Sequence, residues 1–178
     1  MIHRDGPLFL IGYRGTGKTT IAQCVATRLD WAFMDADAEL ERRAGCTIRD
    51  IFAQQGEPAF RDLESGVLAE LAECQRTVIA TGGGVVLREE NRIQLRKGYI
   101  IWLTASVDTL HQRIMADVTT AARRPNLTTQ GGRDEIAALL SAREPRYAEC
   151  ANFTLDTEGA SPEQLADRIL SAWQCETR

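Results

Sequence analysis

Short runs of apolar residues alternate along the chain with longer stretches in which apolar side chains recur every three or four positions. Residues 7–11 form a wholly apolar run, as is typical of a strand buried on both faces. In the stretch that follows, residues 17–30, apolar side chains from Ala22 to Leu29 fall at i, i+3, i+4 and i+7, which predicts an amphipathic helix. The chain is therefore expected to begin with a strand, a connecting loop and a helix.

The same alternation continues to the end of the chain. It predicts further strands at residues 31–35, 77–80, 99–103 and 153–155, and helices at 37–44, 47–54, 58–74, 89–97, 107–116, 134–144 and 161–173. The helix at 58–74 is expected to bury Phe60, Leu63, Val67 and Leu71.

Strands separated by helices form parallel sheets that are covered on both faces. The fold class is therefore α/β, with three layers, α/β/α, around a five-stranded parallel sheet. Residues 1–178 are expected to form a single domain with two excursions, one at about 36–75 and one at about 117–133. The second excursion has no regular period and is expected to be a mobile loop.

Composition and charge exclude several classes of protein. Of the 178 residues, 44% are hydrophobic and 26% are charged, which is ordinary for a globular protein and excludes wholesale disorder. A net charge of −4 argues against non-specific binding of nucleic acid, and no apolar run is long enough to span a membrane. The five cysteines contain no Cys-x-x-Cys pair, which indicates reduced thiols in a cytoplasmic protein rather than a metal site or a disulfide framework.

The loop between the first strand and the first helix carries the strongest chemical signal. Residues 12–19 read Gly-Tyr-Arg-Gly-Thr-Gly-Lys-Thr and match the phosphate-loop pattern G-x-x-x-x-G-K-[ST]. Glycines let several backbone N–H groups turn toward one anion, and the N-terminus of the helix adds partial positive charge. Lys18 would supply a charge at the β- and γ-phosphates, and Thr19 a hydroxyl for Mg²⁺. The sequence therefore predicts a site for a nucleoside triphosphate with Mg²⁺.

A phosphate loop alone does not distinguish a kinase from a switch or a motor. A GTPase reads guanine through Asn-Lys-x-Asp, and this chain has no such motif. Residues 156–159 read Asp-Thr-Glu-Gly and match the Asp-x-x-Gly of a γ-phosphate switch. They follow the fifth predicted strand, which is too late in the chain for that role.

Two more groups of residues follow predicted strands, at the sheet edge where ligands of such folds bind. Asp35 and Asp37 follow the second strand. Since alternate residues of an extended segment face the same way, both carboxylates are expected to point at the phosphate loop, around Mg²⁺ and a substrate hydroxyl. Asp37 also suits the N-cap of the next helix. Gly82, Gly83 and Gly84 follow the third strand and allow a small polar molecule close to backbone N–H groups.

Three arginines are candidates for binding anions. Arg61 and Glu64 lie one turn apart on a predicted helix, where the alternative is a solvated surface pair. Arg143 lies on the apolar stripe of a later helix, just before Pro145, which is expected to end or kink that helix. Its guanidinium must reach solvent or an anion. Arg124 lies in the second excursion and would close over a triphosphate.

Taken in order, these motifs resemble those of shikimate kinases. The set is Gly12 to Thr19, Asp35-x-Asp37, Phe60-Arg61-x-x-Glu64, Thr81-Gly82-Gly83-Gly84, Arg124-Pro125 and Arg143-x-x-x-Tyr147. The resemblance implies a P-loop kinase fold of the nucleoside-monophosphate-kinase kind, with strand order 2-3-1-4-5. It also implies ATP-dependent phosphorylation of the 3-hydroxyl of shikimate, in the chorismate pathway to aromatic amino acids, with Mg²⁺ as cofactor.

The resemblance implies a role for each matching residue. ATP would be bound by Gly15, Thr16, Gly17, Lys18, Thr19, Thr20, Arg113 and Arg124, and Mg²⁺ by Thr19 and Asp35. Shikimate would be bound by Asp37, Arg61, Gly82, Gly83, Gly84 and Arg143, with Phe52 and Phe60 beside its ring and Glu64 orienting Arg61. Lys18, Asp37 and Arg124 would be catalytic, and the excursion at 117–133 would be the lid that carries Arg124.

The chain departs from the family pattern at Asn126, where an aliphatic residue usually follows the proline, and at Arg146. Two alternatives stay open: a kinase of another small metabolite, such as gluconate or a nucleoside monophosphate, and a non-catalytic nucleotide switch. As partners we expect ATP and shikimate, with no nucleic acid and no membrane. The protein is expected to be a monomer.

Overall fold

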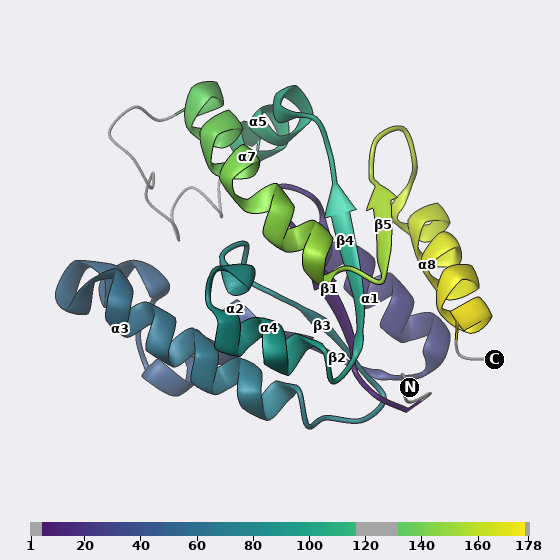
Figure 1. Cartoon of the computed structure of the whole chain (residues 1–178), viewed down its shortest axis with the longest axis horizontal. Helices are drawn as coiled ribbons and strands as arrows, with labels where there is room; N and C mark the ends of the chain where they lie inside the picture. Colours follow the sequence, from purple (N-terminus) through teal and green to yellow (C-terminus); the bar gives the residue numbers. More distant parts are fainter. Residues whose placement is uncertain (1–4, 117–131, 177–178) are drawn as a thin grey trace.

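A five-stranded parallel sheet forms the centre of the computed structural model, which describes residues 5–116 and 132–176 (Figure 1). The strand order is β2-β3-β1-β4-β5, and each neighbouring pair is parallel. The strands are β1 (Leu8–Ile11), β2 (Ala32–Asp35), β3 (Thr77–Ala80), β4 (Tyr99–Thr104) and β5 (Phe153–Asp156). The predicted strands and their predicted order are confirmed.

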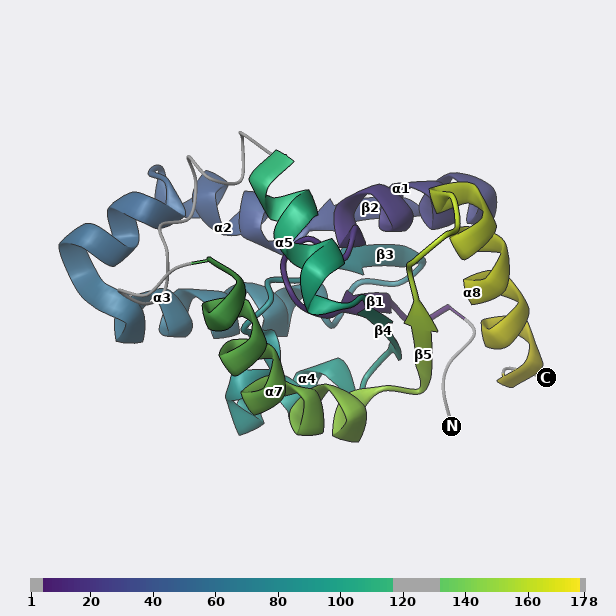
Figure 2. The ribbon, with the colours of Figure 1, turned by 90° about the horizontal axis from the view of Figure 1, so that it is seen from above.

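Helices cover both faces of the sheet, as Figure 2 shows. On one face lie α1 (Lys18–Leu29) and α8 (Pro162–Glu176), and on the other lie α3 (Ile48–Leu71), α4 (Glu89–Leu95) and α7 (Gly132–Cys150). The remaining elements are α2 (Ala36–Ala44), the short 3-10 helix η1 (Val85–Leu87) and α5 (Val107–Ala116).

The central strand shows why the first apolar run has no polar position. Successive side chains of a strand point to opposite faces of the sheet. In β1, Phe9 and Ile11 pack into the core beneath α3 and α4, while Leu8 and Leu10 pack against α1 and α8. All four side chains are fully buried, so an apolar residue is favoured at each of these positions.

The first excursion consists of α2 and a bent α3. Thr47 caps α3 through a capping box with Asp50. The helix bends at Gly56, whose φ of 82° and ψ of 176° are not helical, so the two predicted helices are the two arms of α3. The prediction that Leu63 is buried is wrong, because its side chain is 38% exposed while the neighbouring Glu64 is buried.

The predicted end of the helix before Pro145 is also wrong. Helix α7 continues through Pro145 to Cys150. Proline removes one hydrogen-bond donor, but Tyr147 and Cys150 beyond it are buried against the sheet, and that packing keeps the segment helical.

At its other end α7 begins at Gly132, so residues 132–133 belong to this helix and not to the second excursion. Residues 117–131 lie outside the described part of the chain.

Two further properties concern the chain as a whole. Within residues 5–116 and 132–176, no helix combines the length and the apolar character that crossing a membrane requires. All five cysteines are free thiols.

Candidate active site

The phosphate loop lies at the carboxyl end of β1, before the N-terminus of α1. Gly12 has a φ of +139°, and a side chain there would overlap the carbonyl oxygen of Leu103 in β4, so only glycine fits. The ammonium of Lys18 reaches back over the loop and donates to the carbonyl oxygens of Gly12 and Tyr13, both at 2.8 Å. These contacts keep the loop curled, with the N-terminal end of α1 facing the space beside it.

A cleft of about 530 Å³ opens beside this loop. Of the residues predicted to bind ATP, Gly15, Gly17, Lys18, Thr19, Thr20 and Arg113 line it. Thr16 is buried behind the loop, where its hydroxyl donates to the Tyr13 carbonyl at 2.8 Å. Arg113 donates to the carbonyl of Gly15 at 3.3 Å and to the hydroxyl of Thr157 at 2.9 Å, which ties the loop to the segment after β5. Arg124 lies outside the described residues, so its role stays a prediction.

The two predicted metal ligands are in contact. The hydroxyl of Thr19 donates to Oδ2 of Asp35 at 2.8 Å. Hydroxyl and carboxylate oxygens suit Mg²⁺, which proteins commonly hold through one or two side chains together with the phosphates of a substrate. Within the described residues no group of three or more His, Cys, Asp or Glu side chains could hold a metal alone. The donor set therefore fits a magnesium ion that nucleotide phosphates complete.

The side chain of Asp37 is not oriented by the alternation of an extended segment, contrary to the expectation from the sequence. Asp37 lies in the first turn of α2, so the alternation of an extended segment does not set its orientation. The helix is capped by Asp35, whose Oδ1 accepts the backbone N–H of Asp37 at 3.0 Å and of Ala38 at 3.2 Å. The interpretation of Asp37 as the cap is therefore wrong. Both carboxylates nevertheless line the cleft.

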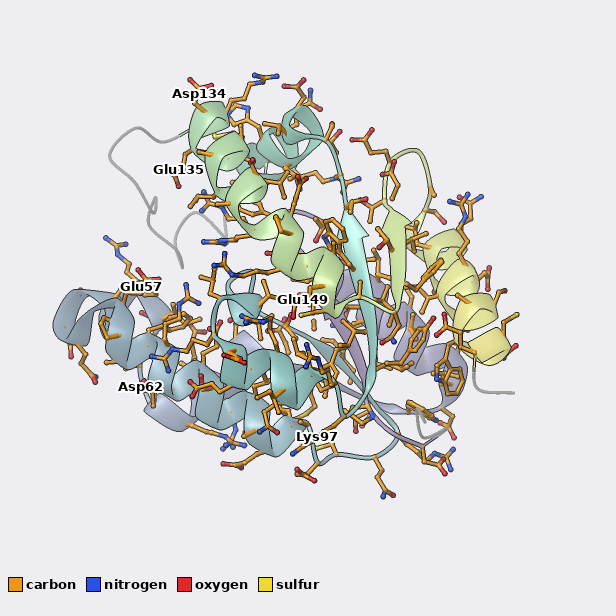
Figure 3. All side chains as sticks on the ribbon, viewed as in Figure 1. Glu57, Asp62, Lys97, Asp134, Glu135 and Glu149 are labelled. Carbon is orange, nitrogen blue, oxygen red and sulfur yellow. The ribbon has the colours of Figure 1, made fainter. Side chains whose placement is uncertain are left out.

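A second, smaller pocket lies between α3 and α7 and adjoins the cleft. In Figure 3 the label Glu57 marks α3 and the label Glu135 marks α7. Its apolar wall includes the rings of Phe52 and Phe60, whose centroids are 4.7 Å apart. Gly83 and Gly84 line the pocket, whereas Gly82 is not among its lining residues. The charged residues that line it are Arg14, Arg61, Glu64 and Arg143. Arg14, Ile48 and Gly83 line both cavities, so the pocket and the cleft meet there.

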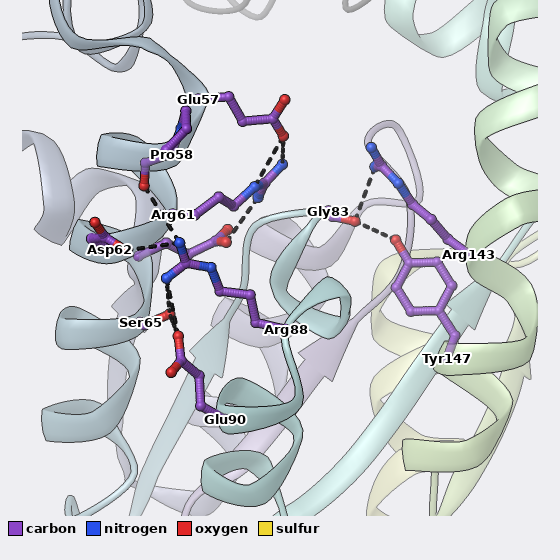
Figure 4. A network of polar contacts seen from close by, with 11 residues as sticks. Glu57, Pro58, Arg61, Asp62, Ser65, Gly83, Arg88, Glu90, Arg143 and Tyr147 are labelled. Carbon is purple, nitrogen blue, oxygen red and sulfur yellow. Dashed lines mark hydrogen bonds and ion pairs between the residues drawn. The ribbon is translucent and has the colours of Figure 1, made fainter.

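Arg61 is held by two carboxylates (Figure 4). Its Nη1 donates to Glu64 at 2.8 Å, and its Nε and Nη2 donate to one oxygen of Glu57 at 3.2 and 3.0 Å. Arg61 and Glu64 are 8% and 6% exposed, so the alternative of a solvated surface pair is wrong. Burial alone would lower the pKa of Arg61, but the charges and hydrogen bonds of Glu64 and Glu57 outweigh it and raise the pKa, so the guanidinium stays charged.

Arg143 faces the pocket rather than solvent. It is 7% exposed, and its Nη1 donates to the carbonyl oxygen of Gly83 at 3.2 Å. Its guanidinium carbon lies 5.7 Å from the centre of the Tyr13 ring, a cation–π arrangement. Since Arg61 reaches the same pocket from α3, two buried cations line one small cavity, which favours an anionic ligand.

Some residues of the site had no predicted role. Arg14 occupies a variable position of the phosphate-loop pattern and forms an ion pair with the buried Glu135 at 3.5 Å. Only its charge inside that motif could have indicated a role. Glu57 stands four residues before Arg61, a helical spacing that predicts the pair. Tyr147 belongs to the motif around Arg143, but nothing in the sequence shows what its hydroxyl contacts.

Sequence and fold both match known proteins. The family model of shikimate kinase matches residues 14–174. A shikimate kinase of Rhodopirellula baltica is 42% identical over 166 residues, which cover 93% of this chain and 89% of that protein. One from Synechococcus is 44% identical over 163 residues, covering 92% and 80%. The structure of shikimate kinase from Acinetobacter baumannii in complex with shikimate has a TM-score of 0.90 at 34% identity, and covers 97% of this chain and 95% of that one. The chain therefore belongs to the shikimate kinase family.

Proposed function

We propose that this protein transfers the γ-phosphoryl group of ATP to the 3-hydroxyl of shikimate, giving shikimate 3-phosphate and ADP. The observation that carries the proposal is the pair of buried arginines, Arg61 and Arg143, in a pocket that meets the phosphate-loop cleft. Guanidinium groups bind carboxylates through paired, charge-assisted hydrogen bonds, and shikimate carries one carboxylate on a ring with three hydroxyls. Membership of the family supports the same substrate.

The residues around the pocket suit such a molecule. The carboxylate would lie on Arg61 and Arg143, with the ring against Phe52 and Phe60. The hydroxyls would then lie toward the cleft, where Asp37 provides an acceptor. The backbone N–H groups of Gly83 and Gly84 are further donors at the edge of the same pocket.

Positioning and charge neutralisation supply most of the catalysis in phosphoryl transfer. We propose that Thr19 and Asp35 hold Mg²⁺, which when bound neutralises charge on the β- and γ-phosphates. The backbone of the phosphate loop holds the phosphates, and Lys18 adds a positive charge beside them. Asp37 orients the attacking hydroxyl, and no strong base is needed because the transition state is loose. Arg124 would add a second positive charge.

The test is release of ADP from Mg·ATP with shikimate, gluconate, nucleoside monophosphates or no acceptor. We expect strong stimulation by shikimate and none by the other acceptors. Stimulation by gluconate or a nucleoside monophosphate would make the protein a kinase of another metabolite. Slow hydrolysis that no acceptor accelerates would point to a nucleotide switch.

Gly84→Ala tests the arginine pocket. A side chain at Gly84 would overlap the guanidinium of Arg61, whereas the backbone φ of −103° suits any residue. We expect the fold to persist, Arg61 to be displaced, and the KM for shikimate to rise about tenfold to a hundredfold, because small misplacements in a site are costly. The matched control is Gly66→Ala in α3, where an added methyl group meets nothing within 4 Å. An unchanged KM for shikimate in Gly84→Ala would remove Arg61 from the substrate site.

A further inference from the structure

The turn after β3 is held from outside the pocket by a buried tyrosine. Tyr147 in α7 is fully buried, and its hydroxyl donates to the carbonyl oxygen of Gly83 at 2.5 Å. Arg143, one helical turn earlier, donates to the same oxygen at 3.2 Å (Figure 4). The Tyr147 ring stacks on Trp102 of β4, with centroids 5.7 Å apart. The tyrosine is therefore fixed at both its ring and its hydroxyl.

A turn with glycine at its third position is sterically able to adopt either of two forms. The N–H of Val85 donates to the Gly82 carbonyl at 3.2 Å and closes a β-turn with Gly83 and Gly84 at its centre. Gly84 has a φ of −103° and a ψ of 2°, close to the values of a type I turn. In a type II turn the central peptide is flipped and the same position takes a positive φ, which glycine adopts at no steric cost. A side chain at Gly84 would displace Arg61, so the pocket favours glycine at this position, and glycine also permits the flip.

A flip would change what the pocket offers a ligand. The described residues contain no cis peptide bond, and a trans peptide holds its C=O and N–H in opposite directions. With the Gly83 carbonyl held toward α7, the Gly84 N–H points away from α7. Both glycines are buried, and within residues 5–116 and 132–176 no protein group accepts a hydrogen bond from either N–H. Buried N–H groups of this kind need a partner, and the pocket beside them is where a ligand can supply it.

We propose that Tyr147 is a positioning residue for shikimate: its hydroxyl selects the type I form of the Gly82–Val85 turn and so presents the Gly84 N–H to the substrate. This inference rests on the proposed function. Arg143 lines the pocket and is available to a substrate carboxylate, whereas Tyr147 is not among the lining residues. The tyrosine is thus the donor that can stay on Gly83 when substrate binds. Burial raises the pKa of Tyr147 to about 12, so the hydroxyl keeps its proton near neutral pH.

Tyr147→Phe tests the proposal, because it keeps the stacked ring and removes only the hydroxyl. We expect the KM and the Kd for shikimate to rise roughly fivefold, the scale of one hydrogen bond, with the KM for ATP unchanged. The matched control is Tyr99→Phe, which removes another fully buried tyrosine hydroxyl, on β4 and outside the lining of both cavities. An unchanged shikimate KM, or an equal rise in both KM values, would leave Tyr147 a purely structural residue.

A second measurement needs no variant. Titration of the wild-type protein with shikimate, followed by NMR, should shift the Gly84 amide proton downfield, and an unmoved Gly84 amide would overturn the proposal. The wild-type assay separates the two ideas. If shikimate does not stimulate ADP release, the proposed function fails. If it does, and Tyr147→Phe behaves as the wild type, only the role of Tyr147 fails.

Discussion

Lys18→Ala is expected to lower kcat for shikimate phosphorylation by about a hundredfold to a thousandfold. A fixed positive charge beside the transferring phosphoryl group stabilises charge that develops in the transition state, and removing one such group costs two to three orders of magnitude in comparable sites. The measurement is ADP release at saturating Mg·ATP and shikimate. The chain provides its own control in the other lysine, Lys97, which is labelled in Figure 3. It is half exposed and pairs with Glu73 at 2.5 Å. Lys97→Ala should have wild-type kinetics.

Lys18 also holds the phosphate loop in shape, so the variant tests two roles of this residue, one in loop structure and one in turnover. Its ammonium bonds to the Gly12 and Tyr13 carbonyls, so the variant will lose some loop order as well as charge. A thermal unfolding curve and a titration with ATP distinguish the two effects. We expect a Tm within a few degrees of the wild type and weaker ATP binding. A variant that folds and keeps more than about a tenth of wild-type kcat would show that Lys18 is not part of the catalytic machinery.

Strands and helices could be predicted from the sequence where the pattern of neighbouring apolar residues alone determines them. β1 is apolar at every position because the sheet is covered on both faces, and α1 carries an apolar stripe for the same sheet. The order of the strands could not be predicted in this way. It depends on which strands pair across the sheet, and no periodicity along the chain encodes that pairing. The resemblance to a family was the source of the predicted order.

Local rules failed where tertiary packing opposed them. By hydrophobicity Leu63 should be buried and Glu64 exposed, yet the reverse holds because Glu64 pairs with the buried Arg61. By its missing N–H, Pro145 should end α7, yet the burial of Tyr147 beyond it continues the helix. For Glu64 the deciding contact is an ion pair within α3, and for Pro145 it is packing of the following residues against the sheet. In each case that contact outweighs the preference of the residue itself.

The candidate site could also be predicted only in part. Its motifs are local and can be recognised in the sequence, but the contacts that orient them are long-range. Arg113 reaches Gly15 across 98 residues, and Tyr147 reaches Gly83 across 64. Such contacts connect motifs that the sequence presents separately. The motif Arg143-x-x-x-Tyr147 is visible in the sequence, but the partner of the Tyr147 hydroxyl is not.

Asp37→Asn is expected to lower kcat about a hundredfold and to raise the KM for shikimate, while the KM for ATP stays within about twofold of the wild type. Asp37 lies in the first turn of α2 and lines the cleft. Its carboxylate can accept hydrogen bonds from the substrate hydroxyls and attract the proton that the attacking oxygen loses. Asparagine has the same shape, but its amide has no charge and presents a donor where an acceptor is needed. Initial rates over a grid of ATP and shikimate concentrations give all three constants.

The fold of the variant is not at risk, because α2 is capped by the side chain of Asp35 and not by that of Asp37. The matched control is Asp167→Asn on α8, an exposed carboxylate paired with Arg28, which should leave all three constants unchanged. If Asp37→Asn raised the KM for ATP as strongly as that for shikimate, Asp37 would belong to the nucleotide side of the cleft. Wild-type kinetics in Asp37→Asn would remove it from the site. Only a loss confined to shikimate binding and to kcat fits a carboxylate that holds the attacking hydroxyl from the cleft beside the pocket.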